Sequence, residues 1–167
     1  EPYILFEPDA AVSESNSGTL TKNITVSLIN ESSELIDSEK IITAAYNLDV
    51  NTDSTSASFD SDVNVNVYED DFHFTNGSLS FNGRTYSYSS ADDEFTPTTG
   101  ETSKTIDLSI YGDVLYEVNE RVTIDLTPTD FVTVTEKTSG DHSFVYTIMD
   151  DDGLPTVSWD GSNLLRE

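Results

Sequence analysis

Apolar and polar residues alternate with a period of two along most of this chain. In Asn23–Ile29, Thr105–Ile110 and Arg121–Leu126 the apolar side chains take every second position, as in a β-strand with one buried face. Similar reasoning predicts seven further strands, at Tyr3–Phe6, Lys40–Tyr46, Val63–Tyr68, Ser78–Phe81, Thr85–Ser89, Phe144–Met149 and Thr156–Trp159. Helical periodicity is weak everywhere, and Ser33–Ser38 is the one candidate for a short helical turn.

Short strands separated by Gly, Asn, Asp and Ser predict an all-β fold. We expect an immunoglobulin-like antiparallel β-sandwich with Greek-key connections, and a barrel is the alternative. The pairs Asn76-Gly77, Asn82-Gly83 and Thr99-Gly100 predict hairpins. Two polar stretches, Asn47–Asp62 and Tyr88–Gly100, enlarge the middle region. We expect them to be solvated loops, or else loops that supply metal ligands or contact a partner.

The end of the chain repeats the pattern of its beginning. Pro155, Val157, Trp159, Asp160, Leu165 and Glu167 align with Pro2, Ile4, Phe6, Glu7, Val12 and Glu14 at a constant offset of 153 residues and without a gap. We therefore expect residues 1–153 to form one sandwich module and residues 154–167 to be the start of the next repeat or a linker strand. Targeting signals would then lie elsewhere in a longer protein.

Acidic residues dominate the charge. The 167 residues include 32 Asp and Glu against 7 Lys and Arg, a formal net charge of -25. Such a field repels nucleic acid and anionic membrane surfaces, so we expect no nucleic-acid binding and no membrane insertion. It also opposes compaction unless cations offset it, which favours a bound divalent metal. Because cysteine is absent, disulfides, thiolate catalysis and Cys-based metal sites are excluded.

Carboxylates stand where predicted strands end. Asp150, Asp151 and Asp152 follow one predicted strand, Asp113, Glu117 and Glu120 lie in the connection between two others, and Glu14 stands where the first strand gives way to the second. Calcium takes roughly six to eight oxygen ligands, mostly carboxylates and carbonyls from several loops. Strand ends in a sandwich can share one pole, so this pattern predicts a calcium site.

Three motifs follow one another in the second half of the chain. They are Thr99-Gly100-Glu101-Thr102-Ser103-Lys104-Thr105-Ile106, then Tyr111-Gly112-Asp113-Val114-Leu115-Tyr116-Glu117-Val118-Asn119-Glu120, and finally Ile148-Met149-Asp150-Asp151-Asp152-Gly153. Together they resemble the second half of a Calx-beta module, and Val12–Thr19 resembles its first strands. The resemblance implies an immunoglobulin-like sandwich with calcium at one pole. Such modules occur as tandem repeats in sodium-calcium exchangers, an integrin subunit and large bacterial surface proteins.

The resemblance also implies a ligand set. Carried over residue by residue, the acids that match the calcium-binding motif are Glu14, Asp113, Glu117, Glu120, Asp150, Asp151 and Asp152. Gly112 stands where many members have another Asp, a change that would remove a ligand. The middle lacks the family's Asp-Gly-Thr-Ala turn, and the missing loop ligand is one of Asp53, Asp62, Asp71 and Asp92, which the sequence leaves open.

Little in the sequence points to catalysis. His73 and His142 lie outside any nucleophile or zinc motif, so we expect no enzyme activity. We predict a calcium-binding structural repeat of a large extracellular or cell-surface, adhesin-like protein, in which Ca2+ stabilises the fold and stiffens the link to neighbouring modules. One alternative is a regulatory calcium sensor of a transporter or signalling protein. Another is a carbohydrate- or protein-binding module that uses the inserted middle, with Tyr86 and Tyr88 among the contact residues.

Overall fold

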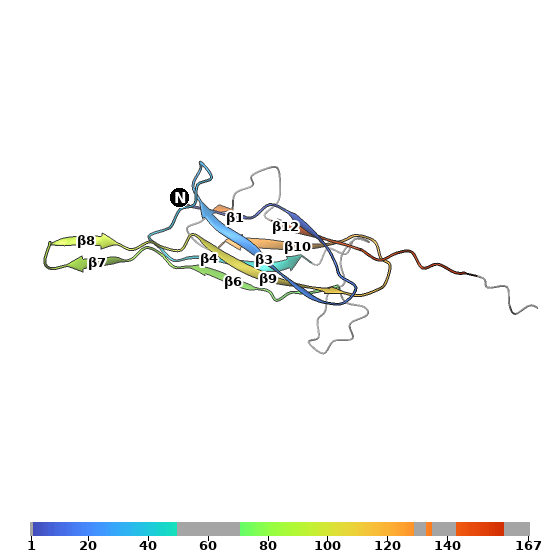
Figure 1. Ribbon diagram of the computed structural model, residues 1–167. Coiled ribbons are helices and arrows are strands. Elements are labelled where there is room, and N and C mark those ends of the chain that lie inside the picture. The colour runs from blue at the N-terminus through green and yellow to red at the C-terminus, as the bar shows by residue number, and fades with distance from the viewer. Residues whose placement is uncertain (1, 50–70, 129–132, 135–142, 159–167) are drawn as a thin grey trace, which may run out of the picture.

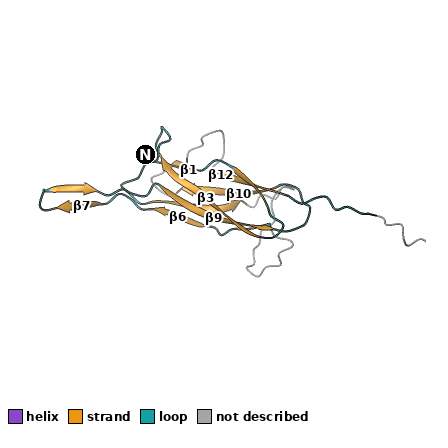
Figure 2. Ribbon diagram, viewed as in Figure 1, coloured by secondary structure: helices purple, strands orange, loops and turns teal. Residues whose placement is uncertain are grey.

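A computed structural model describes residues 2–49, 71–128, 133–134 and 143–158, and its regular structure is β-strand (Figures 1 and 2). One sheet contains, in order, β11 (Thr133–Val134), β1 (Tyr3–Phe6), β3 (Gly18–Ile29), β9 (Ser103–Gly112) and β5 (Phe72–His73). The second contains β2 (Ala10–Ser13), β12 (Ser143–Met149), β10 (Glu120–Pro128), β4 (Ile42–Asp49) and β6 (Gly77–Phe81). A separate two-stranded sheet consists of β7 (Tyr86–Ser89) and β8 (Glu94–Pro97). No helix that could cross a membrane occurs in the described residues.

The two large sheets bury their facing side chains in a single core, which confirms the predicted β-sandwich. Alternate residues of β3, β9, β10 and β12 are buried, as the period-two pattern requires. The core members from these strands are Ile24, Val26, Leu28, Ile106, Leu108, Ile110, Val122, Ile124, Leu126, Phe144, Tyr146 and Ile148. Phe144 also packs against Phe6, with ring centroids 5.6 Å apart, and so links the two sheets.

The chain changes sheet between β1 and β2, which only Glu7, Pro8 and Asp9 separate. β1 runs antiparallel to β3, whereas β2 runs parallel to β12. Proline lacks the N–H that a sheet ladder needs, and Asp9 Oδ1 accepts a hydrogen bond from the Val145 backbone N at 3.0 Å. The crossing makes β2 the edge strand of the second sheet. Both sheets are antiparallel except for the edge pairs β2–β12 and β1–β11, which are parallel.

Eight of the ten predicted strands coincide with β1, β3, β4, β6, β7, β9, β10 and β12. Val63–Tyr68 lies outside the described residues. The short strands β2, β5, β8 and β11 were not predicted. β5 and β11 have only two residues, too few to show a period, and β2 shows no alternation of apolar and polar residues. β8 lies in the polar stretch Tyr88–Gly100, which was expected to be a loop. The predicted helical turn at Ser33–Ser38 is wrong: the Asn30 side chain accepts hydrogen bonds from the backbone N–H groups of Ser32 and Glu34, which forms a tight turn instead.

The three predicted hairpin turns are also wrong. Asn76-Gly77 and Asn82-Gly83 each join strands that lie in different sheets, and Thr99-Gly100 lies between β8 and β9. Two of these glycines permit close packing: a Cβ at Gly83 would lie 2.8 Å from the backbone carbon of Lys40, and one at Gly100 would lie 3.0 Å from the Arg84 nitrogen. The hairpin that does form joins β7 to β8, so Tyr88–Gly100 lies outside the sandwich but is largely strand.

Residues 154–158 follow the sandwich without regular structure, so the predicted strand Thr156–Trp159 does not form over its described part. Val157 is 99% exposed, whereas Ile4, its counterpart at the offset of 153, is fully buried. Ile4 pairs with Leu28 of β3 on one side and with β11 on the other. Among the described residues no strand lies beside 156–158, so Val157 has no comparable ladder.

Candidate metal centre

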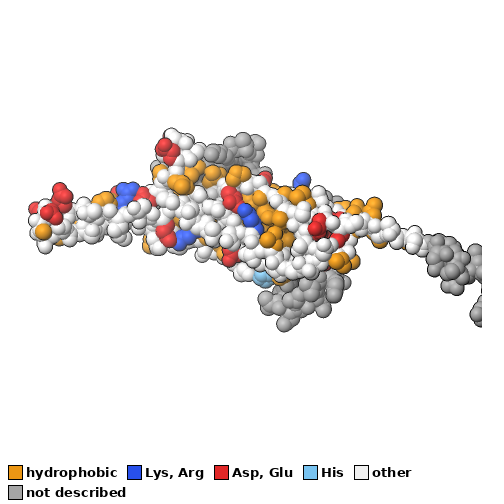
Figure 3. Space-filling view, in the orientation of Figure 1, with side chains coloured by type: hydrophobic (Ala, Val, Ile, Leu, Met, Phe, Trp, Pro, Cys, Tyr) orange, Lys and Arg blue, Asp and Glu red, His pale blue; other side chains and the backbone are white. Residues whose placement is uncertain are grey.

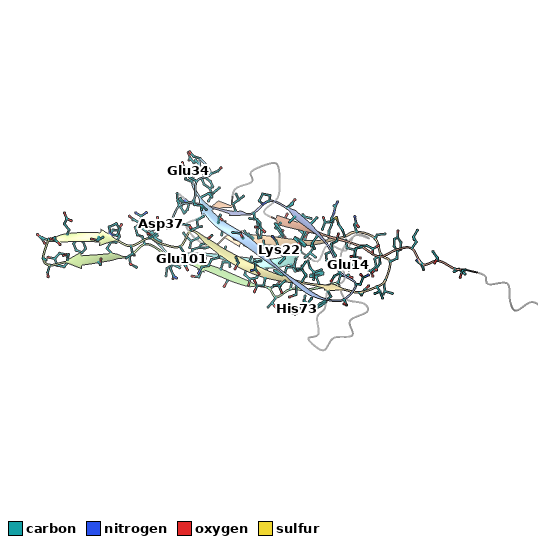
Figure 4. The ribbon with its side chains drawn as sticks, viewed as in Figure 1. Glu14, Lys22, Glu34, Asp37, His73 and Glu101 are labelled. Atoms are coloured by element: carbon teal, nitrogen blue, oxygen red, sulfur yellow. The ribbon has the colours of Figure 1, made fainter. Side chains whose placement is uncertain are left out.

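Strands of both sheets end together at one pole of the sandwich, and acidic residues stand at those ends. Ser13 of β2 pairs with Met149 of β12 in parallel, so Glu14 and Asp150 leave the second sheet side by side. The backbone N of Glu14 donates a hydrogen bond to the Met149 carbonyl at 3.0 Å. β10 runs antiparallel to β12 and begins at Glu120, opposite Ile148. We call this end of the sandwich the acidic pole; Figure 4 labels Glu14 there.

The first sheet adds a carboxylate to the acidic pole through its edge strand β5. Asp71 immediately precedes β5, and its carbonyl accepts a hydrogen bond from the Tyr111 backbone N at 2.9 Å. β5 is in turn paired with β9, with Phe72 opposite Ile110. The short strand thus fixes Asp71 beside the connection between β9 and β10, which contains Glu117.

The carboxylates at this pole form two groups. Glu14, Asp150 and Asp152 offer oxygen atoms that lie within 4.8 Å of one another, and so do Asp71, Glu117 and Glu120. A hydrogen bond from the Glu117 backbone N to Asp150 Oδ2, 3.2 Å long, joins the two groups. Six acids from four separate segments therefore converge where calcium, a hard cation, would find oxygen ligands.

Glu14 lies in an environment that disfavours its charge. It is only 6% exposed, and burial followed by the charges of Asp113, Glu117, Asp150 and Asp71 raises its pKa from 4.5 to about 7. Little positive charge compensates, because the ion pairs found in the described residues involve Glu7, Asp37 and Glu101 and not these acids. A bound cation would supply the missing charge.

Glu117 and Glu120 show the same effect in the second group. Burial, with Asp71 as the next cause, raises the pKa of Glu117 to about 7 and that of Glu120 to about 8. Crowding with Asp71 thus disfavours the charged forms of both glutamates. A bound cation would favour those charged forms, so its binding would release protons.

Two carboxylate oxygens at the acidic pole are buried without a hydrogen-bond partner. They are Glu120 Oε2 and Asp152 Oδ2, one from each group. The remaining contacts of Asp152 are accounted for: Oδ1 accepts from Asn16 Nδ2 at 2.6 Å, and its backbone N donates to Asp150 Oδ1 at 2.9 Å. Buried polar atoms usually have partners, so these two oxygens fit ligands of a metal ion.

Two of the seven predicted ligands lie outside both groups. The first is Asp151, which is exposed. Its charge still acts on the site, since burial, followed by the charges of Asp151 and Asp150, raises the pKa of Asp152. Asp113 accepts a hydrogen bond from the Leu115 backbone N through Oδ1 at 2.6 Å, which shapes the loop. Its charge nevertheless acts on Glu14 and Glu117, so Asp113 lies close enough to strengthen the field at the pole.

The structure distinguishes among the candidates for the middle ligand. Asp71 belongs to the acidic pole, whereas Asp92 lies in the β7–β8 hairpin and bonds to Ser89 Oγ at 3.0 Å. Asp53 and Asp62 lie outside the described residues. Figure 1 shows that hairpin at the opposite end of the sandwich from the departing C-terminal segment. Sequence reasoning could not choose Asp71, because the signal that identifies it is the pairing of a two-residue strand.

Close packing explains why a glycine stands at position 112. A Cβ at this position would lie 1.8 Å from the Ser15 carbonyl oxygen, closer than any side chain permits. Gly112 pairs with Gly18 at the end of the β3–β9 ladder, and Gly18 has a φ of 93°, a conformation that favours glycine. The close approach positions the 14–17 turn over the acidic pole, so an Asp here would collide with the turn that carries Glu14.

Comparison with solved structures identifies the same fold elsewhere. The apo-form Calx CBD1 domain matches with a TM-score of 0.55 and 17% identity, over 90% of this chain and 98% of that one. CBD12 from CALX1.2 matches with a TM-score of 0.54 and 18% identity, and the calcium binding domain CBD12 of CALX1.1 with 0.53 and 19%. The alignments span 44% and 46% of those two longer chains. The resemblance to Calx-beta modules is thereby confirmed for the fold.

Comparisons with family models and with curated protein sequences gave no match. The structural likeness is thus far stronger than the likeness in sequence.

Proposed function

We propose that this chain is a calcium-binding module whose ion or ions lie at the acidic pole. The observation that carries the proposal is the convergence of Glu14, Asp71, Glu117, Glu120, Asp150 and Asp152 from both sheets, with two buried oxygens that have no partner. The likeness to a structure titled as a calcium binding domain supports the choice of metal. The donor set is all oxygen, which suits calcium better than zinc or copper.

In this proposal the ion has a structural role. It would join segments of both sheets at the end of the sandwich and replace like-charge repulsion with attraction. Extracellular calcium modules bind with dissociation constants of about 10⁻⁴–10⁻³ M. At a free calcium concentration of roughly ten to a hundred times the dissociation constant, each ion would stabilise the fold by about 1.4–2.7 kcal/mol.

We further propose that the module is one repeat of a longer extracellular or cell-surface protein of the adhesin type. Support comes from the offset of 153 residues between the two ends of the sequence, and from the exposure of Val157, whose counterpart Ile4 is buried. Asp150 and Asp152 lie immediately before the connection to the next repeat. Calcium at these residues would therefore restrain that connection as well as the fold.

The test is calcium titration of the chelator-treated chain by calorimetry, with parallel melting curves. We expect saturable binding and a higher melting temperature in calcium than in excess EDTA. Magnesium at the same concentration serves as the control, because its small octahedral shell suits this large carboxylate cluster less well. Identical melting curves with calcium and with EDTA would refute the proposal.

A regulatory calcium sensor is the second candidate, and the likeness to the Calx domains is equally consistent with it. Affinity separates the two roles, since sensors bind at about 10⁻⁷–10⁻⁵ M and extracellular modules near 10⁻⁴–10⁻³ M. The same titration therefore decides between them.

A further inference from the structure

The β7–β8 hairpin forms an arm that projects from the sandwich at the end opposite the acidic pole (Figure 1). Its register places Tyr86 opposite Pro97 and Tyr88 opposite Phe95. Side chains alternate between the two faces of a ribbon, so these four residues share one face. The other face carries Ser87, Ser89, Glu94 and Thr96. The arm is thus apolar on one side and polar on the other.

The aromatic face of the arm is largely uncovered in the described chain. Tyr86, Tyr88 and Phe95 are between 51% and 69% exposed, and the rings of Tyr88 and Phe95 lie against each other with centroids 5.0 Å apart. The hydroxyl groups of the two tyrosines donate hydrogen bonds to Glu39 and Asp93, which leaves the rings themselves exposed. A two-stranded hairpin on its own is marginally stable in water. An apolar face on such a ribbon is therefore a surface for docking.

Polar contacts fix the arm at its base. Asp37, in the connection between β3 and β4, forms an ion pair with the Arg84 guanidinium and accepts a hydrogen bond from the Gly100 backbone N at 2.8 Å. Arg84 and Gly100 flank the two strands of the arm, and Tyr86 Oη donates to Glu39 at 3.1 Å. Asp37 and Glu101 are labelled at this base in Figure 4. The arm is thus held in its direction rather than attached by a free loop.

A second apolar surface lies at the acidic pole. Val114, Leu115, Tyr116 and Val118 of the β9–β10 connection, together with Leu154, are 44% to 68% exposed. In the described part of the chain, nine of the twelve exposed large hydrophobic side chains belong to the arm, to this connection or to residues 154–157. Figure 3 shows apolar side chains beside acidic ones at this end. Unpartnered apolar surface is therefore concentrated at the two ends of the module.

We propose that the aromatic face of the arm docks on the 114–118 connection and Leu154 of a second copy of the fold, the preceding module in the same chain. The contact is head to tail, so it can repeat along an array. This inference rests on the tandem-module part of the proposed function.

The length of the connection supports this occupant. If the repeat begins at the offset of 153, residues 150–155 are all that separates β12 from the next β1. Six residues span at most ~20–22 Å. The chain enters the sandwich at the arm end and leaves at the acidic pole (Figure 1). The strands of the arm have four residues each, so the arm is ~13 Å long. The arm of one module must therefore point toward the acidic pole of the preceding module.

Charge makes the contact depend on calcium. The tip of the arm carries Asp92, Asp93 and Glu94, which the carboxylates of the opposing pole repel. Bound calcium would neutralise that pole and permit docking. The aromatic contact should consequently strengthen when calcium is added and weaken in EDTA.

The experiment uses the 167-residue chain, whose lack of cysteine makes a single spin label at Asp92→Cys specific. Labelled chain is mixed with isotope-labelled chain at about 1 mM in calcium, because short linkers produce effective concentrations in the millimolar range. We expect broadening of amide signals at residues 114–118 and 154 of the other copy. Intramolecular broadening there is excluded because the ten residues of β9, which run from the base of the arm to the acidic pole, alone span ~33 Å.

Matched variants make the outcome specific. Tyr88→Ser with Phe95→Ser should abolish the broadening, and Ser87→Ala with Thr96→Ala, on the other face, should retain it. Unchanged spectra of the core strands will show that both variants are folded. The proposal is overturned if no broadening occurs, if it appears elsewhere, or if the aromatic variant keeps it.

Calcium titration of the same proteins separates this inference from the proposed function. The arm variants should bind calcium as the parent does, because the arm lies far from the acidic pole. Calcium binding without contact at residues 114–118 and 154 would sink the docking proposal alone. Contact without calcium binding would leave the docking itself in place, but it would refute both the calcium dependence of docking and the calcium proposal.

Discussion

Replacing Glu14 by Gln should change stability in opposite directions with and without calcium. Glu14 is 6% exposed and lies among Asp71, Asp113, Glu117 and Asp150. The raised pKa, about 7 in the fold against 4.5 in the unfolded chain, means that the folded protein binds the proton more tightly. This contribution to stability is complete below pH 4.5 and is lost as the pH rises through about 7.

The size of the effect follows from the same pKa. A rise from 4.5 to about 7 corresponds to about 3 kcal/mol, at ~1.4 kcal/mol for each tenfold change in proton affinity. Because Glu14, Glu117 and Glu120 repel one another, their separate destabilising effects cannot be added. We therefore take about 3 kcal/mol as the free energy gained when one charge is removed from the cluster. At pH 8 without calcium, Glu14→Gln should raise the melting temperature by ~6–12 °C in a domain of this length.

The assay is thermal unfolding by circular dichroism in EDTA at pH 8 and pH 5, with repeats in millimolar calcium. Glu94→Gln is the matched control, since it removes the same charge from an exposed position on the arm. The gain from Glu14→Gln should shrink to about a quarter of its pH 8 value at pH 5, just above the unfolded pKa, and in calcium the variant should melt below the parent because it lacks a ligand. If calcium-free Glu14→Gln at pH 8 is no more stable than Glu94→Gln, the charge of Glu14 does not destabilise the calcium-free fold.

Three further predictions concern the ligand set, the release of protons and the packing of the 14–17 turn. Asp71→Asn should weaken calcium binding at least tenfold by calorimetry, whereas Asp92→Asn, at the other end of the molecule, should leave the affinity unchanged; equal effects would contradict the placement of the ligands. Calcium affinity should fall as the pH drops from 8 to 6, because protons on Glu117 and Glu120, with pKa values of about 7 and about 8, must leave first; a titration series in which affinity is constant would contradict proton release. Gly112→Ala should destabilise the fold by about 1–3 kcal/mol in chemical denaturation, since its Cβ would lie 1.8 Å from the backbone of the 14–17 turn; an unaffected midpoint would show that this close approach is absent.

The sandwich could be predicted from the sequence because burial of one face imposes a period of two. That period is visible in the long strands β3, β9, β10 and β12, whose alternate residues form the core. It says nothing about which sheet a strand joins. The crossing at Glu7-Pro8-Asp9 and the edge strands β2 and β5 depend on pairing with distant residues, so they were found only in the structure.

The candidate site could be predicted in part for a related reason. Glu14, Glu117, Glu120, Asp150 and Asp152 stand at strand ends, and the ends of paired strands share a pole. The sequence could not show that Asp151 is exposed while its two neighbours converge. A hydrogen bond from Asp152 N to Asp150 Oδ1 forms a local turn that brings those two residues together. Whether this turn forms depends on how the folded chain leaves β12, which the sequence does not show.

The misassigned glycines have a similar explanation. Asn82-Gly83 has the composition of a hairpin turn, but Gly83 is needed because its backbone approaches Lys40. A contact between residues so far apart in sequence leaves no local signal. The enlarged middle region was recognised by its composition, yet only the structure shows that part of it is the ordered β7–β8 arm.

Long-wavelength anomalous diffraction from crystals of this chain grown with calcium would locate the ion most directly. We expect anomalous density at the acidic pole, among Glu14, Asp150 and Asp152 or among Asp71, Glu117 and Glu120. A folded chain in saturating calcium with no density at this pole, or with density only at the Asp92-Asp93-Glu94 tip of the arm, would contradict this placement of the ion.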